Sequence, residues 1–438
     1  MTRTTIPTQD RDVLVSRLRE ARAQTDEIFA LIEPGALYER PIPERHRLVF
    51  YLGHLEAFDW NLVARQACGL EPFHPDFDRL FAFGIDPVDG GLPDEPASSW
   101  PGRPAVEEYN RRVRERLDEC VSGRVAGAQD PAVVEMAIEH RLMHAETLAY
   151  LLHQLPYAAK RAPRSGAPPT ARAPEPEARR TLVPAGPATL GRPADGPGFG
   201  WDNEFSVRVV DVPEFSIDVH KVTNRRFLEF VRDGGYAARE LWTDTAWDWI
   251  QRSGIRHPTF WNERDREWTL RGMFAETPLP LAAPAWVSHA EASAFARWAG
   301  KSLPTEAQFH RAAYGTPAGG DRDYPWGAAA PDERHGNFDF HGWDPMPVGA
   351  HPASASAFGV DELVGNGWEW TSSVFEPLPG FRPHPFYPGY SANFFDDRHY
   401  VMKGGSPRTA ACMLRRSFRN WFQPLYPYVY AGFRLVDE

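Results

Sequence analysis

A proline- and alanine-rich stretch divides this chain into two parts. Residues 157–180 read YAAKRAPRSGAPPTARAPEPEARR and contain almost no large hydrophobic side chains. A segment of this composition cannot bury a core and is typical of a semi-extended linker. The chain has 438 residues, so the parts on either side, residues 1–156 and 181–438, are long enough to form separate cores. The sequence therefore predicts two domains joined by this linker.

The first part is predicted to be helical. Four segments have the composition and boundaries of long helices: residues 10–32, 45–69, 105–123 and 130–156. Gly69 and Gly123 are expected to end the second and third helices, and Asp130 followed by Pro131 is typical of a helix start. We therefore expect a four-helix bundle, a fold that often builds metal sites from side chains on facing helices.

The second part has a different character. Its segments are short, aromatic residues are frequent, and Gly and Pro mark many turns. Thr223, Ser288 and Thr305 precede short helical patterns and are expected to be N-caps. Downstream segments alternate between strand and loop composition, so the chain as a whole is predicted to be an α+β protein of more than one domain.

Three histidines of the first part are candidate metal ligands. In EHRLMHAETL, residues 139–148, His140 and His144 are four residues apart, so on a helix their Cβ atoms would be roughly 5–6 Å apart on one face. His54 lies in the apolar stretch YLGHLEAFDW of another predicted helix. The alternatives are two surface histidines and one core histidine bonded to a carbonyl. Three imidazoles would leave coordination positions open, as a catalytic metal requires, but imidazole suits zinc, copper, iron and nickel alike.

Charge and cysteine content exclude several classes of protein. The net charge is −11 and the pI is about 5.8, which argues against nucleic acid or an anionic membrane as a partner. The three cysteines, Cys68, Cys120 and Cys412, are far apart and form no C-x-x-C pair. The first residues lack the hydrophobic region of a signal peptide, and no apolar run approaches the roughly 20 residues of a membrane span. We therefore expect a soluble protein of the reducing cytoplasm.

Six short motifs carry a resemblance to a known family. VTNRRFLEF, LPTEAQFHRAA, YPWG, NGWEWT, KGGS and GFRL occur in this order, as in the formylglycine-generating-enzyme-like (sulfatase-modifying factor) domain. That resemblance implies a C-type-lectin-like fold for residues 181–438, and the helical part resembles a DinB-like bundle. Together and in this order, the two parts resemble the ergothioneine and ovothiol sulfoxide synthases (the EgtB/OvoA type) over almost the whole chain.

The resemblance implies a specific chemistry. In that family, Fe(II) held by three histidines, here His54, His140 and His144, uses O₂ to join a thiol to the imidazole of hercynine, which is trimethylated histidine. A carbon–sulfur bond and a sulfoxide form together. The cofactor expected here is therefore Fe(II), and the expected partners are small molecules: hercynine, O₂ and a sulfur or selenium compound.

The family's betaine-binding stretch matches SFRNWFQPLYPYVYAGFRL, residues 417–435, at Asn420 and Trp421. The alternative is that Trp421 is a core residue and Asn420 a turn residue. Charged residues that hold a carboxylate-bearing thiol in the ergothioneine synthases are replaced here by Phe422, Gln423 and Tyr426, and a common glutamine between the ligand histidines is Met143. These departures resemble the selenoneine synthase branch, as does the segment 77–93, and they favour a neutral selenosugar over glutamylcysteine.

A tyrosine proton donor is also implied by the resemblance. Phe375 has no hydroxyl group, so Tyr387 and Tyr390 are the candidates, with aromatic packing in a loop as the alternative. Two other classes of function remain open. A formylglycine-generating enzyme would need a pair of C-terminal cysteines, and Cys412 stands alone. A non-catalytic lectin-like binding protein would not need the three histidines.

Overall fold

The computed structural model describes residues 8–82, 96–123, 130–163 and 177–437. Contacts between residues divide the chain into two compact units. Unit 1 comprises Met1–Gly166 with Pro385–Tyr387, and unit 2 comprises Ala167–His384 and Pro388–Glu438. Residues 164–176 of the predicted linker and residues 83–93 of the segment that resembles selenoneine synthases lie outside the described residues.

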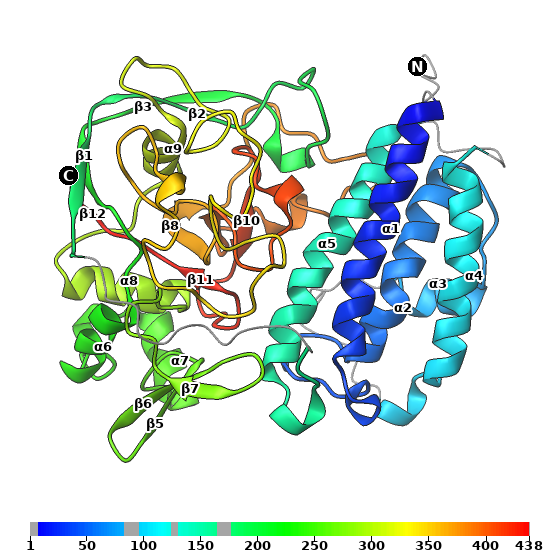
Figure 1. Ribbon diagram of the computed structural model, residues 1–438, viewed down its shortest axis with the longest axis horizontal. Coiled ribbons are helices and arrows are strands. Elements are labelled where there is room, and N and C mark those ends of the chain that lie inside the picture. The colour runs from blue at the N-terminus through cyan, green and yellow to red at the C-terminus, as the bar shows by residue number, and fades with distance from the viewer. Residues whose placement is uncertain (1–7, 83–95, 124–129, 164–176, 438) are drawn as a thin grey trace. The chain divides into compact units, whose positions relative to one another are not determined.

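The described part of unit 1 contains four long helices that run alongside one another (Figure 1). They are α1 (Thr8–Ala30), α2 (Leu48–Asp59), α4 (Arg103–Val121) and α5 (Pro131–Gln154). Helix α1 packs against α5, and α2 packs against both α4 and α5. A π-helical segment, Trp60–Ala67, continues α2, and the short helix α3 (Pro75–Leu80) follows it. The prediction of a helical N-terminal part is confirmed.

Local sequence explains where these helices end. Gly123 follows α4 with a φ of +77°, and Gly69 follows the π-helical segment with a φ of +69°. This left-handed backbone conformation costs glycine least, which is why glycine so often follows a helix. Both glycines were predicted as helix ends, and both are.

In its described residues, unit 2 combines four small sheets with short helices. The strand orders are β1-β4-β12, β10-β9-β8-β11, β2-β3 and β5-β6-β7. The strands are β1 (Arg180–Val183), β2 (Gly186–Leu190), β3 (Arg208–Val212), β4 (Phe215–Asp218), β5 (Trp261–Arg264), β6 (Glu267–Arg271), β7 (Glu276–Pro278), β8 (Trp368–Val374), β9 (Tyr400–Lys403), β10 (Asn420–Phe422), β11 (Ala431–Gly432) and β12 (Val436–Asp437). The helices are α6 (Asn224–Arg232), α7 (Asp244–Ser253), α8 (His289–Trp298) and α9 (Glu306–Tyr314).

The helix starts predicted for unit 2 are present. Thr223 accepts a hydrogen bond from the backbone N–H of Arg226 at the start of α6. Ser288 and Thr305 form capping boxes with Glu291 and Gln308 at the starts of α8 and α9. Helix α9 packs against β2, and the core around it includes Phe309, Val183, Ile217 and Val436. The predicted α+β class is confirmed.

Strand β10 holds three of the residues that were predicted to bind substrate. It is an edge strand of the four-stranded sheet and pairs antiparallel with β9. The register places Asn420 opposite Met402, Trp421 opposite Val401 and Phe422 opposite Tyr400. Because successive side chains of a strand point to opposite faces, Trp421 lies on one face, and Asn420 and Phe422 lie on the other.

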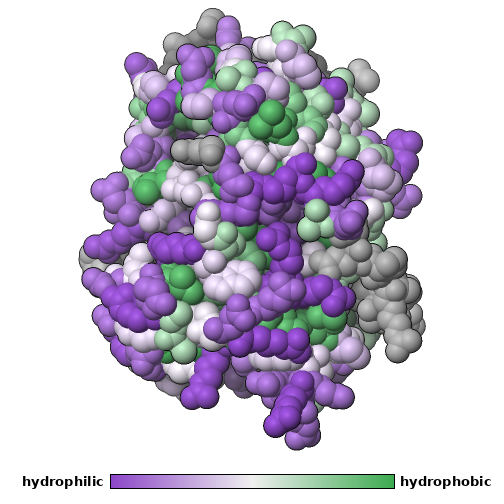
Figure 2. Space-filling view, turned by 90° about the vertical axis from the view of Figure 1, so that its left-hand side faces the viewer, coloured by the Kyte–Doolittle hydropathy of each residue, from purple (hydrophilic) through white to green (hydrophobic). Residues whose placement is uncertain are grey.

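The surface mixes polar and apolar side chains. On the face shown in Figure 2, hydrophilic residues surround small hydrophobic areas. The exposed large hydrophobic residues of the described chain are Val13, Leu182, Val207, Val209 and Met346. Among the described helices, none combines the length and the apolar composition that crossing a bilayer requires.

Candidate metal centre

Two helices of unit 1 bring three histidines together. His54 lies on α2, and His140 and His144 lie four residues apart on α5. Residues at this spacing share one face of a helix, and α2 packs against α5. All three residues are buried, with 2–3% of their surface exposed. The structure thus groups the three histidines that the sequence predicted as ligands.

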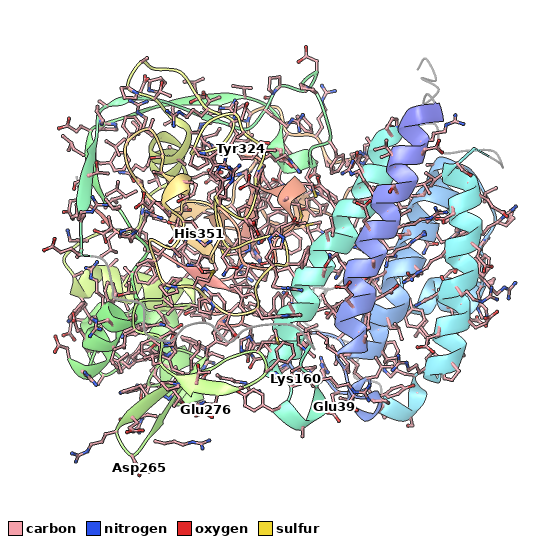
Figure 3. The ribbon with its side chains drawn as sticks, in the orientation of Figure 1. Glu39, Lys160, Asp265, Glu276, Tyr324 and His351 are labelled. Atoms are coloured by element: carbon pink, nitrogen blue, oxygen red, sulfur yellow. The ribbon has the colours of Figure 1, made fainter. Side chains whose placement is uncertain are left out.

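Both ligand helices are fixed by their own sequence. Helix α2 is apolar on nearly all sides, which is typical of a helix that is buried all round. At the start of α5, the Asp130 carboxylate accepts a hydrogen bond of 2.9 Å from the backbone N–H of Ala132. At its end, the Lys160 ammonium group, labelled in Figure 3, donates to the carbonyls of Leu152 and His153, each at 3.1 Å. A cation that binds the last carbonyls complements the helix dipole and stabilises the helix end.

Two of the ring nitrogens have the spacing of ligands on one metal ion, and a nitrogen of the third histidine lies near them. The Nε2 atoms of His140 and His144 are 3.1 Å apart. Two ligands on one ion with bonds of about 2.1 Å are separated by at most about 4.2 Å, so this pair meets the requirement. One ligand atom from each of the three histidines lies within 4.8 Å of the others. Glu139 and Glu146 are buried beside them in sequence but do not belong to this group.

The hydrogen bond of His54 leaves the other nitrogen of its ring available. His54 Nδ1 donates to the backbone carbonyl of Phe81 at 2.7 Å, and its Nε2 has no hydrogen-bond partner in the described structure. The Nδ1 atoms of His140 and His144 are likewise buried without a hydrogen bond among the described residues. Buried polar atoms without partners are costly, so the unpaired Nε2 of His54 fits a site that a metal ion completes.

A glycine makes the contact between His54 and Phe81 possible. A Cβ atom added at Gly53 would come within 2.5 Å of the Phe81 ring. Glycine at this helical position therefore lets the Phe81 ring lie directly against α2. The close approach holds the Phe81 carbonyl beside the neighbouring residue, His54.

The electrostatics of the site keep the imidazoles neutral. Burial lowers the pKa of His54 to about 4, although the hydrogen bond to Phe81 opposes this shift. Burial also lowers the pKa values of His140 and His144 well below the usual range; His144 and His54 lower that of His140 further, and His54 lowers that of His144. A neutral imidazole is the form that binds a metal. The donor set therefore fits a divalent transition metal with open coordination positions.

A buried ionic network lies next to the ligands and joins the same two helices. Arg141 follows His140 on α5 and is fully buried. Its guanidinium group donates to Asp59 at 2.7 Å and lies 3.1 Å from the Glu56 carboxylate, both on α2. Arg114 of α4 also pairs with Glu56 at 2.6 Å. The network links α2, α4 and α5, and it was not predicted from the sequence. Its signal is the pair of acidic residues, Glu56 and Asp59, inside an otherwise apolar helix.

The two candidate tyrosines have different surroundings. Tyr387 belongs to unit 1, where its ring centroid lies 6.2 Å from that of His140 and 5.2 Å from that of Phe58. Tyr390 belongs to unit 2, where its ring stacks on Trp201 at 3.8 Å. Of the two, Tyr387 is therefore the one placed near the histidines.

The predicted substrate-binding residues separate into groups. Trp421 stacks on Phe375 at 4.1 Å, forms a T-shaped pair with Tyr390 at 5.4 Å, and lies 5.6 Å from the tilted ring of Phe394. Phe422 stacks on Tyr426 at 5.3 Å. Gln423 is exposed, and Met143 is half-buried on α5 between the two histidines of unit 1.

Comparison with known proteins identifies the second part of the chain. Residues 166–438 match the sulfatase-modifying factor enzyme 1-like domain family. The match covers more than half of the chain, so the chain contains this domain, and the predicted lectin-like α+β fold is confirmed.

Three curated proteins are similar to this chain, two of them along more than nine-tenths of its length. Hercynine oxygenase of Mycolicibacterium smegmatis is 38% identical over 97% of this chain and 99% of its own length. Hercynine oxygenase of Mycobacterium tuberculosis is 41% identical over 54% of this chain and 55% of its own length. Ergothioneine biosynthesis protein 1 of Neurospora crassa is 29% identical over 92% of this chain and 55% of its own length.

A helical unit with three buried histidines that could hold a metal ion is joined to this domain. With the similarity to hercynine oxygenases, this arrangement places the chain among enzymes of the oxidoreductase class. The chain belongs to the EgtB/OvoA-type sulfoxide synthase family, which includes the hercynine oxygenases.

Proposed function

We propose that this chain is a non-haem iron enzyme that joins a selenosugar to hercynine. The similarity to a hercynine oxygenase along nearly the entire length of both chains, together with the buried histidine group, supports this proposal. In the proposed coupling, hercynine loses the hydrogen of one imidazole carbon and the selenol loses its proton. A carbon–selenium bond forms, one oxygen atom of O₂ becomes the selenoxide oxygen, and the other leaves as water.

His54, His140 and His144 are the residues that would hold the metal. Fe(II) is among the metals that imidazole ligands accept, and when bound it would supply the activation of O₂ and the redox chemistry. The protein's contribution is to hold three neutral imidazoles in place and to exclude competing reactions. The burial of the three rings and their lowered pKa values support this role.

Tyr387 is the residue that we assign as proton donor. Its ring lies 6.2 Å from the ring of His140, and a phenol at this place can deliver the proton of its hydroxyl group to oxygen. Tyr390, the other candidate, stacks on Trp201 in unit 2, and we assign it a packing role.

Asn420 and Trp421 are proposed to bind hercynine. The face of a Trp ring attracts a quaternary ammonium group, with an energy of about 0.5–2 kcal/mol depending on desolvation. Aromatic neighbours surround Trp421, among them Phe375 and Phe394. The side chain of Asn420 accepts a hydrogen bond from the backbone N–H of Trp421, and its NH₂ group is a suitable donor to the carboxylate of the substrate.

The charges of residues 415–426 support a neutral second substrate. The stacked pair Phe422 and Tyr426 carries no charge. The arginines of this stretch are engaged in ion pairs: Arg415 with Glu204, Arg416 with Asp321 and Arg419 with Glu306. A buried carboxylate without a partner is costly, so a substrate such as glutamylcysteine is disfavoured. The hydroxyl groups of a sugar can instead bind Gln423, Tyr426 and backbone groups.

A thiol-using enzyme of the ergothioneine type is the second candidate, favoured by the similarity to ergothioneine biosynthesis protein 1. A product assay separates the two. The purified chain is given hercynine, O₂ and Fe(II) with a selenosugar, a thiosugar, cysteine and glutamylcysteine in competition, and the products are measured by mass spectrometry. We expect the selenoxide conjugate of hercynine. Efficient turnover of glutamylcysteine, with none of the selenosugar, would return the chain to the ergothioneine type.

Other classes are less consistent with the residues present. Cys412 is the one cysteine of the second part, so the cysteine pair of a formylglycine-generating enzyme is missing. A non-catalytic binding protein would contain no stoichiometric iron, which metal analysis of the purified protein would reveal. The free thiols of Cys68, Cys120 and Cys412 suit the reducing cytoplasm, where we expect the enzyme to act.

A further inference from the structure

The three ligand histidines are not held in the same way. His54 donates its Nδ1 proton to the Phe81 carbonyl, which fixes both the ring orientation and the tautomer. His140 Nδ1 has no hydrogen-bond partner among the described residues. Metal-binding histidines almost always fix their rings with such a bond. Another restraint must therefore orient the ring of His140.

Phe58 provides that restraint. Its ring stacks on His140 with centroids 3.4 Å apart and an angle of 12° between the ring planes. The torsion that turns an imidazole ring about its bond to Cβ is intrinsically broad. A parallel ring at van der Waals distance blocks this rotation, because any large turn would drive the imidazole edge into the Phe58 ring. The stack thereby keeps His140 Nε2 aimed at His144 Nε2, 3.1 Å away.

The position of Phe58 follows from the spacing on α2. It is four residues after His54, so both side chains lie on the same face of that helix. One face of α2 therefore carries a metal ligand and the platform for a second ligand that comes from α5. Phe58 is half-buried, and its ring meets that of Tyr387 edge to face at 5.2 Å.

We propose that Phe58 is a positioning residue for the metal centre: its ring takes the place of the missing hydrogen bond and fixes the plane of His140. The inference rests on the proposed binding of a metal by the three histidines. It assigns Phe58 no contact with the metal, only control of the ligand that makes one.

Metal affinity of the full-length protein tests the inference without any turnover. Co(II) is the probe, because its visible absorption bands report ligand geometry, and affinity is measured by competition with a chelator. Replacing Phe58 by Leu keeps an apolar side chain but removes the flat surface. We expect F58L to lose about tenfold or more in Co(II) affinity, the range typical of groups that orient a ligand, and to shift the Co(II) bands. F58Y keeps the flat ring, so its Co(II) affinity and its Co(II) bands should match those of the unchanged protein.

Phe50 supplies the matched control. It stacks on His54 at 4.8 Å, but His54 keeps its hydrogen bond to Phe81, so F50L should bind Co(II) nearly as the unchanged protein does. Urea unfolding of the metal-free variants measures how much each substitution lowers the free energy of unfolding. Equal losses of affinity in F58L and F50L, or an unchanged spectrum and affinity in F58L, would overturn the inference. If the unchanged protein binds no metal, the proposed metal site fails as well.

Discussion

The backbone carbonyl of Phe81 accepts a hydrogen bond of 2.7 Å from Nδ1 of His54. Since a carbonyl can only accept, His54 carries its proton on Nδ1, and the lone pair of Nε2 is left for a metal. The residue before His54 is Gly53, and the Phe81 ring packs directly against it. This packing places the Phe81 carbonyl within hydrogen-bond reach of His54.

Replacing Gly53 by Ala should weaken metal binding. Alanine is the better helix former by about 1 kcal/mol, but its Cβ atom would lie within 2.5 Å of the Phe81 ring. The ring must move, and its carbonyl moves with it. We expect about a tenfold loss of Co(II) affinity, as for other groups that orient a ligand. Chelator competition measures the loss, and wild-type affinity in G53A would show that the close approach is not required.

Removal of a ligand should abolish stabilisation by metal. A metal that binds only the folded state raises the free energy of unfolding by about 2.7 kcal/mol at a free concentration of 100 times Kd. We expect this gain for the unchanged chain and its absence for His54→Ala, His140→Ala and His144→Ala. Thermal unfolding with and without Fe(II) under anaerobic conditions provides the measurement. His153→Ala, at a histidine of α5 outside the group, serves as a control that should keep the gain.

Breaking the ionic network should destabilise unit 1. Arg141→Met leaves Asp59 buried without its guanidinium partner, and the loss of one member of a buried pair typically costs about 3–5 kcal/mol. Arg111→Met removes exposed pairs with Glu108 and Glu115 and should cost less than about 1 kcal/mol. Urea unfolding of the metal-free protein compares the two. A similar loss of unfolding free energy in both variants would show that the buried network stabilises the fold no more than a surface ion pair does.

Tyr387→Phe should slow the reaction far more than Tyr390→Phe. General acid catalysis contributes about 10²- to 10⁴-fold, so Tyr387→Phe is expected to lower kcat by a factor in this range with little change in metal content. Tyr390 stacks on Trp201, and that contact survives removal of the hydroxyl group. Product formation under single-turnover conditions is the readout. A larger effect at Tyr390 would transfer the proton-donor role to that residue.

Acid should destabilise unit 2 through His289. Burial lowers the pKa of this histidine to about 3, with its hydrogen bond to the Thr371 carbonyl opposing the shift. Between about pH 6.5 and pH 3, the unfolded chain binds the proton and the folded chain does not. Stability is therefore lost as the pH falls through this window, by at most about 1.4 kcal/mol per pH unit.

The variant His289→Gln keeps a donor for Thr371 and removes the titration. We expect the difference in unfolding free energy between the variant and the unchanged chain to move in favour of the variant as the pH falls from 6.5 to 4.5. Urea unfolding across this range measures it. A difference that does not depend on pH would contradict the assignment.

Local sequence patterns predicted the long helices, their ends and the pair His140 and His144, whereas His54 was added to the pair as a residue of a facing helix. The N-caps Thr223, Ser288 and Thr305 depend on hydrogen bonds only a few residues long, and His140 and His144 are related by helical spacing alone. Such features are visible in a sequence because the partners are close along the chain.

The features that orient the ligands were not predicted, because they depend on residues far apart in the chain. Phe81 reaches His54 across 27 residues, and Arg141 reaches Asp59 across 82. The choice between Tyr387 and Tyr390 also needed the structure, since only tertiary packing places Tyr387 near His140. Trp421, assigned a binding role from its motif, is also one partner of a tight stack with Phe375.

The alternation of side chains along strand β10 has a consequence for sequence change at neighbouring positions. Its neighbouring side chains face in opposite directions, so Trp421 and Phe422 have separate surroundings, one with Phe375 and the other with Tyr426. A mutation at position 422 can alter one set of contacts while the other remains as it was. Sequence change at positions 421 and 422 can therefore proceed independently, each within its own cluster of aromatic rings.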